Sequence, residues 1–498
     1  MKVRLIFIGL VMMLLTACTL VTDGDPDVTV PEVSKHYINL SIAVANNNGS
    51  VTRGTPSGGE DGDGREPGFA RENAVTGITL ILYQTSDAAG INTTTDPTID
   101  FVAYYPVFRT TKDTDARIEA TYQTGDQLMP HNAIDYTKTY RAIVVANADL
   151  TGSVTAGTST LNTLRNMTLN RIYSGDETTA ATACGNFVMS SEQDQTLNFA
   201  ASGIRTQDAA GDYYYNLTDQ PLVIERLAAR IDFWAVNGTY NADKAGYVYN
   251  VGSTSDRFVV TGIMPFNLNN GTNIAETKFG NEYLLKRLTA SLSTITPQWL
   301  IDETTGNYVL DPQTASKVTA THPLLTNSLE SVKALTTAEA FSANRYYKSI
   351  ATMHAAVQPS GTSAGYVSLT DGGKTGEDVI VAYPMENTLL TESPLYYHAT
   401  GIAIEGYYYK GGLTDASPKR MVYYGYLRHQ GEGTSYDITT TNDPTADLPN
   451  ASTAMNFGIV RNNIYRVIIK EVAPDTGILK LTIAVHDWRN VEHPIIYI

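Results

Sequence analysis

The stretch His36–Gly54 constrains the fold most, because a regular strand pattern stops abruptly inside it. Its apolar side chains recur with the period of a half-buried β-strand, at Ile38, Leu40, Ile42 and Val44. The polar run 46–50 (NNNGS) follows, and then Arg53, a setting typical of an exposed loop that proteases can cut. We therefore predict an N-terminal strand that proteolysis can separate from the rest of the chain.

Length and composition indicate a large, acidic, β-rich protein. At 498 residues the chain is too long for a single hydrophobic core, so two or more domains are expected. The 31 tyrosines favour strands over helices, as do the frequent Thr, Val and Ile residues. A formal net charge of −16 argues against nucleic acid as a partner, because nucleic-acid binding needs a basic surface.

The first residues are typical of an export signal. Lys2 and Arg4 precede the apolar run Leu5–Leu15, which as a helix would span about 16 Å, roughly half of a bilayer core. The run ends in 15–18 (LTAC), which is similar to the lipobox of bacterial lipoproteins, with Cys18 as the lipidated residue. The alternative is an ordinary signal peptide with a chance cysteine. If Cys18 is lipidated, Cys184 has no disulfide partner, and its apolar surroundings favour a buried structural thiol.

Alternating apolar patterns place the remaining strands and predict few helices. Strands are expected at 78–83, 140–148, 222–236, 247–251, 257–263, 379–383, 396–409, 420–427, 464–471 and 479–486. The segment 78–83 is apolar on both faces and should be an interior strand, whereas 222–236 fits a helix and a strand about equally before its strand-like end. Leucines near helical spacing predict one short helix within 158–169 and short helices or an elaborated loop within 320–347. Many strands with few helices favour β-sandwich domains.

No constellation of catalytic or metal-binding residues stands out. The segment 361–365 (GTSAG) matches the G-x-S-x-G pattern of hydrolases, but it lacks the strand before and the helix after that the motif requires. The eight histidines, among them His131, His354, His398 and His429, show no metal-ligand spacing. We expect no catalytic residues, no metal site and no cofactor.

Several short motifs in the right order resemble the fimbrillins, the major fimbrial subunits of Bacteroidales. They are found at 15–18 (LTAC), 52–54 (TRG), 72–83 (ENAVTGITLILY), 140–148 (YRAIVVANA), 225–233 (ERLAARIDF), 381–387 (VAYPMEN), 458–470 (GIVRNNIYRVIIK) and Trp488. The region 260–375 matches nothing in that pattern.

The resemblance implies two transthyretin-like β-sandwich domains in a mainly β chain with a few short helices. It implies export as an outer-membrane lipoprotein, cleavage by an Arg-specific extracellular protease, and loss of the first strand together with the lipid. The C-terminal segment of another subunit would then fill the groove, and repetition would build a head-to-tail fimbria on the cell surface with this chain and other fimbrial subunits. The corresponding segments are a signal peptide at 1–17, a propeptide at 18–53, a linker at 54–71, domains at 72–236 and 237–488, and a donor tail at 489–498.

Two assignments within this scheme leave alternatives open. Cleavage is expected between Arg53 and Gly54, with Arg65 and Arg71 as alternatives in the same linker. The apolar donor residues are expected to be Val491, Ile495, Ile496, Tyr497 and Ile498, in either register. Pro494 is awkward in an inserted strand because it cannot donate a ladder hydrogen bond. The alternative is that the tail is a terminal strand of its own domain.

Three functions are compatible with the sequence. The leading hypothesis is a structural subunit of the fimbrial shaft. The second is a tip or accessory adhesin, in which 260–375 would contact host or bacterial surface ligands. The third is a monomeric surface lipoprotein that binds glycans through the tyrosine clusters at 396–397, 407–409 and 423–424, although a core or sheet-surface role for these tyrosines is the simpler interpretation.

Overall fold

We describe the protein from a computed structural model of the chain. It describes residues 34–44, 72–85, 96–109, 120–165, 167–170, 187–191, 194–269, 281–283, 299–302, 306–309, 325–356, 364–371, 373–385, 387–388, 399–427, 434–445, 458–459, 461–474 and 477–487. Structural statements below refer to these residues.

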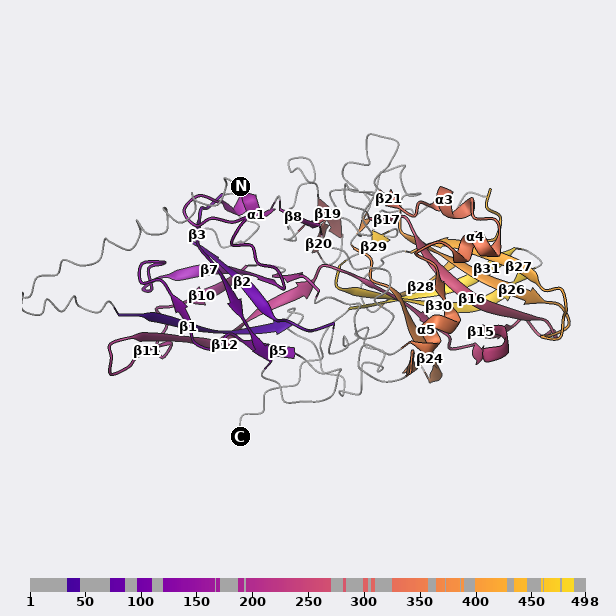
Figure 1. The fold of residues 1–498 in the computed structure, drawn as a ribbon, viewed down its shortest axis with the longest axis horizontal. Helices are drawn as coiled ribbons and strands as arrows, with labels where there is room; N and C mark the ends of the chain where they lie inside the picture. Colours follow the sequence, from indigo (N-terminus) through magenta and orange to yellow (C-terminus); the bar gives the residue numbers. More distant parts are fainter. Residues whose placement is uncertain are drawn as a thin grey trace, which may run out of the picture.

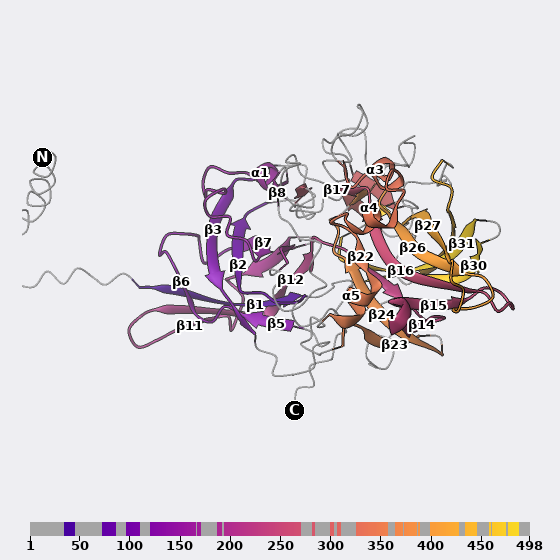
Figure 2. The same ribbon diagram turned by 45° about the vertical axis from the view of Figure 1, so that its right-hand side comes forward.

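The protein is mainly β, with two large sheets and a few short helices, as the sequence predicts (Figure 1). One sheet has 11 strands and is built mostly from the first half of the chain, and the other has 12 strands from the second half. In Figures 1 and 2 the two sheets lie beside each other along the long axis of the molecule. Each half therefore contains its own extended strand system.

The N-terminal sheet folds into two layers that share its longest strand, β12 (Tyr213–Arg226). In one layer, β12 pairs with β1 (His36–Val44) from Tyr213 to Ile224 and with β11 (Arg205–Gln207) at its start. Strand β1 pairs in turn with β5 (Ala120–Gln123) and β6 (Gln127–Met129), and β4 (Phe108–Arg109) pairs with β5. The other layer contains β2 (Gly77–Tyr83), β3 (Ile99–Pro106), β7 (Thr139–Ala146), β9 (Met189–Ser190) and β10 (Gln195–Asn198). The aliphatic side chains of both layers belong to one buried core.

The interior strand that the sequence predicts at 78–83 is confirmed. All seven residues of β2 are buried, and β2 pairs with β3 on one side and β7 on the other. A strand paired on both edges and covered on both faces needs apolar residues at every position. The strand predicted at 140–148 corresponds to β7, and it ends at Asn147, whose φ of 61° turns the chain.

The C-terminal sheet is a single curved series of strands with a second core. Its order is β14 (Thr239–Asn241), β15 (Gly246–Asn250), β16 (Arg257–Phe266), β26 (Gly401–Tyr409), β27 (Lys419–Tyr426), β28 (Thr434–Thr441), β31 (Ile478–Asp487), β30 (Asn463–Ala473), β13 (Arg230–Trp234), β24 (Lys374–Ala382) and β23 (Val367–Asp371), with β22 (Lys348–Ser349) paired to β16. Helix α5 (Ile350–Ala355) lies against β15, β16 and β24, and Ile350 and Met353 join the core.

Two ambiguous segments have clear outcomes. The segment 222–236 is strand throughout most of its length, as the end of β12 and as β13. Because β13 pairs with β24 and β30, the change from one sheet to the other falls at 227–229, inside the range predicted as the N-terminal domain. Within 158–169 the helix is shorter than expected. Helix α1 (Leu161–Arg165) ends before Leu169, which lies in β8 (Thr168–Asn170), and β8 pairs with β18 (Asn281–Tyr283).

The region 320–347 contains short helices in its described part. Helix α3 (Leu329–Lys333) and helix α4 (Ala338–Ser342) begin at Ser328 and Thr337, whose hydroxyls accept hydrogen bonds from the backbone of the first turn. The remaining short strands are β17 (Leu268–Asn269) with β21 (Leu325–Thr326), β19 (Trp299–Asp302) with β20 (Gly306–Val309), and β25 (Asn387–Thr388) with β29 (Gly458–Ile459). None of the helices in the described part of the chain has the length and apolarity to span a membrane.

Replacing Asn147 with alanine is expected to destabilise the N-terminal sheet by about 2–4 kcal/mol. The Asn147 amide donates to the carbonyls of Ala74 (2.8 Å) and Phe187 (2.7 Å), accepts from the Thr76 N–H (3.0 Å), and tolerates the positive φ better than alanine does. Urea unfolding of the variant measures the loss. Asn198→Ala is the control, because it removes a local turn bond to Ala200 and should cost less than about 1 kcal/mol. Equal effects of the two variants would contradict this role for Asn147.

Candidate functional site at the first strand

Strand β1 closes a gap in the middle of a sheet. It runs parallel to β12 along one edge and antiparallel to β5 and β6 along the other. Figures 1 and 2 show β1 beside β12 and β5. Among the described strands, β4, β5 and β6 join the rest of the sheet through β1 alone. Removing β1 would therefore open two unpaired backbone edges at once.

The four aliphatic residues of β1 lie in the core of the N-terminal half. The exposed fraction is 0% for Ile38, Leu40 and Ile42 and 1% for Val44. Ser41 and Ala43, on the alternate positions, are also buried, at 4% and 5%. The second half of β1 is thus buried on both faces, which the alternating pattern alone did not indicate. Small side chains at these two positions suit a covered face.

Backbone contacts hold β1 at its start and in its middle. The Lys35 N–H donates to the Asp212 carboxylate (2.8 Å), and the Tyr213 N–H donates to the Lys35 carbonyl (2.8 Å). The Leu40 N–H donates to the Thr124 hydroxyl (3.0 Å), and the Thr124 N–H donates back to the Leu40 carbonyl (3.1 Å). Next to Leu40, the parallel register with β12 shifts, so that Leu40 lies opposite Leu217 and Ile42 opposite Leu222.

His36, the first residue of β1, lies in an aromatic box. Its ring stacks on Tyr136 with centroids 4.0 Å apart and faces Tyr215 at 5.8 Å and Tyr213 at 5.2 Å. Its Nδ1 lies 3.3 Å from the Tyr215 hydroxyl, and its Nε2 lies 3.2 Å from Nδ1 of His131. Sequence reasoning missed this box, because its walls come from β12 and from the turn after β6, about 100 or more residues away. The three consecutive tyrosines at 213–215 were the available signal.

Burial of His36 lowers its pKa, and the neighbouring His131 imidazole lowers it further. The carboxylate of Asp212 raises the pKa and the guanidinium of Arg205 lowers it, both by smaller amounts. The pair of imidazoles can share one hydrogen bond while at least one ring is neutral, whereas two charged rings would repel each other. The neutral form of His36 is therefore the one that fits the box.

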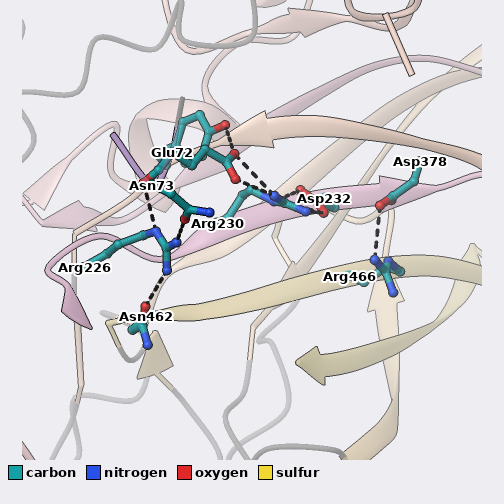
Figure 3. A network of polar contacts seen from close by, with 9 residues as sticks. Glu72, Asn73, Arg226, Arg230, Asp232, Asp378, Asn462 and Arg466 are labelled. Carbon is teal, nitrogen blue, oxygen red and sulfur yellow. Dashed lines mark hydrogen bonds and ion pairs between the residues drawn. The ribbon is translucent and has the colours of Figure 1, made fainter. Parts of the chain in front are cut away.

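The first residues after the linker are anchored in a second, fully buried network (Figure 3). Arg230 donates to the Glu72 carboxylate (3.0 Å) and, in a bidentate pair, to Asp232 (2.9 and 2.7 Å). Arg226 donates to the Glu72 carbonyl (3.1 Å) and contacts the side chains of Asn73 and Asn462. The Glu72 carboxylate also accepts a hydrogen bond from the hydroxyl of Tyr383, which follows β24 in the second half of the chain. This network, which we call the junction network, joins the end of β12, β13 and the loops before β2 and β30.

The charged side chains of the junction network are buried, and their two positive charges are balanced by two negative charges. Glu72, Asn73 and Asp232 have an exposed fraction of 0%, and Arg226 and Arg230 of 2% and 4%. Burial lowers the pKa of Arg226 to about 10, so its guanidinium stays charged at neutral pH. Buried charges of this kind are tolerated where each is paired and hydrogen-bonded. Glu72 is the first described residue after the linker, and its contacts in the junction network do not involve β1.

The other predicted site residues lie outside the described residues: Cys18, Arg53, Gly54, Arg65, Arg71, Val491, Ile495, Ile496, Tyr497 and Ile498. Of the tyrosine clusters, Tyr409, Tyr423 and Tyr424 are buried and Tyr407 and Tyr408 half-buried, which agrees with a core and sheet-surface role. His354 stacks between Tyr240 and Tyr366 and pairs with Glu377 (3.1 Å). Within the described ranges, no group of three His, Cys, Asp or Glu residues could hold a metal ion.

Comparison with known proteins gives similarity to fimbrial structures only at a low level. No protein-family model matches the chain, and no curated protein matches it in sequence. The C-terminally truncated tip fimbrial protein Mfa3 from Porphyromonas gingivalis covers 91% of this chain and 100% of its own, at 10% identity and a TM-score of 0.37. A proposed cell adhesion protein from Parabacteroides distasonis covers 92% and 100%, at 13% identity and a TM-score of 0.41. The fimbrilin FimA from Porphyromonas gingivalis covers 92% and 99%, at 13% identity and a TM-score of 0.34. At this level of similarity we draw no functional inference from these structures.

Replacing Glu72 with alanine is expected to destabilise the protein by about 3–5 kcal/mol, because Arg230 and the Tyr383 hydroxyl then lose a buried partner. Denaturant unfolding measures the change. Glu471→Ala is the control: it removes an exposed ion pair with Lys480 and should cost at most about 1 kcal/mol. A loss of less than about 1 kcal/mol for Glu72→Ala would show that the junction network is not an anchor.

The hold on β1 is expected to weaken as the pH falls below about 6.5. Because the pKa of His36 is lowered in docked β1, released β1 binds a proton at His36 more readily than docked β1 does. Docking is therefore fully favourable above the ordinary histidine pKa of 6.5, and this contribution is lost progressively below it. Hydrogen exchange of the β1 amides between pH 5 and 8, corrected for intrinsic rates, measures this. Local exchange is needed because His486, also buried with a lowered pKa, acts on the second sheet in the same direction.

In the His36→Phe variant the pH dependence of β1 exchange should disappear, because phenylalanine keeps the ring stacking and does not titrate. His354→Phe serves as a matched control in the other half of the chain and should keep the dependence. A dependence that persists in His36→Phe would contradict the assignment.

Proposed function

We propose that this protein is a structural subunit of a cell-surface fimbria and polymerises by strand exchange at the position of β1. The observation that carries the proposal is that β1 is a middle strand, while the segment 45–71, with its three arginines, separates it in sequence from the anchored Glu72. Cutting that segment frees β1 without breaking any other strand. The remaining body then presents a groove with a backbone edge on each side.

The free energy of apolar burial favours a groove filled by another strand over a groove left empty by β1. Burying each of the four aliphatic side chains contributes about 1.5–3 kcal/mol, or about 6–12 kcal/mol together. An added strand also satisfies the edges of β12 and of β5 and β6 through its main chain. Because groove and donor tail lie at different places on one subunit, the contact is head-to-tail and propagates as a filament.

The proposed maturation follows from the order of segments. Cys18 carries acyl chains that hold the precursor at the outer membrane, and an Arg-specific protease cuts between Arg53 and Gly54. The burial of Glu72 favours Arg53 or Arg65 over Arg71, since a protease needs flexible chain on both sides of the bond. The freed groove accepts the tail 489–498 of the next subunit, so the partners are further copies and other fimbrial subunits.

Cutting the purified full chain with an Arg-specific protease should release β1 and yield a ladder of polymers on denaturant-free gels. Arg53→Ala with Arg65→Ala should prevent release, because the remaining site at Arg71 adjoins buried Glu72. Deleting 489–498 should leave a cut, folded, monomeric chain. A cut chain with an intact tail that stays monomeric would contradict a shaft subunit and favour the tip or monomeric lipoprotein alternatives. Polymers formed without 489–498 would contradict the donor assignment.

A further inference from the structure

The walls of the box around His36 are all residues outside β1. Its walls are Tyr213 and Tyr215 on β12 and His131 and Tyr136 in the turn after β6, and none of them belongs to the departing strand. With His36 at 7% exposure, the box is a nearly closed site at one end of the groove. Whatever replaces β1 must also fill this site.

The box is built for a planar group that forms hydrogen bonds. Tyr136 and Tyr215 lie nearly parallel to the His36 ring, at 14° and 12°. The Tyr215 hydroxyl and Nδ1 of His131 address the two opposite nitrogens of that ring. An aliphatic side chain would fill part of the volume but would form a hydrogen bond with neither the Tyr215 hydroxyl nor Nδ1 of His131.

The C-terminal tail repeats the side-chain pattern of β1. Residues 36–40 read His-Tyr-Ile-Asn-Leu, and residues 493–497 read His-Pro-Ile-Ile-Tyr. Both segments place a histidine, an isoleucine and a larger apolar residue at alternate positions. In β1 these three are the box residue and the first two core residues, Ile38 and Leu40.

We propose that the box is a recognition site for His493 of an incoming tail and that it sets the register of strand exchange. This proposal rests on the proposed function. The tail runs parallel to β12, as β1 does, with His493 in the box, Ile495 at the Ile38 position, Tyr497 at the Leu40 position and Ile498 at the Ser41 position, so that it replaces the first half of β1 and pairs with β6. The Leu40 site has to widen for the tyrosine ring.

This register also places Pro494 where a proline is least harmful. It falls at the position of Tyr37, the second residue of the strand, whose side chain is half-buried and stacks on Tyr214 at the outer face. Proline is tolerated near the start of a strand, and the missing N–H costs about 1 kcal/mol there. A proline deeper in the inserted strand would interrupt pairing on both sides.

A register of the same direction shifted by four residues reaches the Ile42 and Val44 positions with Ile495 and Tyr497, but it is less favourable at the start of the strand. It places Val491 at Ile38, His493 at Leu40 and Pro494 at Ser41. An imidazole would then enter a site with 0% exposure lined by apolar residues, and Arg489 would occupy the box beside Arg205 and His131. Each of these placements leaves a buried polar or charged group without a matched partner.

Disulfide trapping distinguishes the two registers. The main-chain N–H and C=O of Leu40 point toward Thr124 on the β5 edge. Because Tyr37 is an odd number of residues from Leu40 along the strand, its main-chain groups point the other way, toward β12. Tyr37 and Leu128 on β6 are therefore a non-hydrogen-bonded antiparallel pair, with Cα atoms about 4.5 Å apart, which a disulfide can bridge. Leu128 is 57% exposed, so Leu128→Cys should be tolerated.

The full chain with Leu128→Cys and Cys184→Ser is combined with either Pro494→Cys or Asn490→Cys, cut with the Arg-specific protease and oxidised. Covalent polymers with Pro494→Cys and none with Asn490→Cys are expected. The reverse result, or polymers that neither pair cross-links, would overturn the register. A full chain without any of these substitutions that fails to assemble after cutting would overturn the proposed function and this inference with it.

Synthetic peptides of residues 488–498 give a measurement that does not depend on folding of a variant. They are used to block assembly of the cut full chain. His493→Leu and Ile495→Ala peptides should need about tenfold higher concentration, which corresponds to about 1.4 kcal/mol, while Val491→Ala should act like the natural sequence, since Val491 precedes the groove. An effective His493→Leu peptide, or a weakened Val491→Ala peptide, would overturn the proposal.

Discussion

The N-terminal half of this protein depends on strand β1, which pairs with strands far from it in sequence. Strand β1 supplies a backbone partner to β12 on one edge and to β5 and β6 on the other, and its aliphatic side chains complete the core. An edge strand could leave at the cost of one set of ladder bonds. A middle strand leaves two open edges and an apolar slot, so its position can be vacated only if another strand takes it.

Two different kinds of contact hold β1 and the body behind it. β1 is held by apolar burial and by the His36 box, interactions that another strand with similar side chains can reproduce. The body beyond the linker is held at Glu72 by Arg230, a buried ion pair that requires its own partners and is costly to break. The segment 45–71, between β1 and Glu72 in sequence, contains the arginines at which cleavage is expected.

The junction network also explains why the two sheets are coupled. Arg226 closes β12 in the first sheet and contacts Asn462 at the start of β30 in the second, while Glu72 contacts Tyr383 just after β24. A charged, fully hydrogen-bonded contact is specific in geometry, because any shift would leave a buried charge unpaired. The position of β1 therefore belongs to a body whose two sheets are connected by specific buried contacts.

Sequence reasoning identified strands best where burial is simple. The apolar run of β2 and the alternation at the start of β1 correspond to the observed elements, because side-chain period follows directly from how many faces are covered. It was less successful at 158–169, where Leu169 leaves the helical register to pair with a strand more than 100 residues away. The box residues His131 and Tyr136 carried no local signal, since an isolated histidine or tyrosine in a turn is compatible with many environments.

By itself, the sequence determined a mainly β protein with a well-formed strand at His36–Val44 ahead of a polar segment in which cleavage is predicted. These are local properties, set by side-chain period and by turn and linker composition. Only the tertiary structure decided that this strand is a middle strand, that its histidine lies in a box of tyrosines, and that Glu72 anchors the chain behind it. Those facts depend on which distant segments lie side by side, and pairing between strands far apart in sequence leaves no periodic trace in either one.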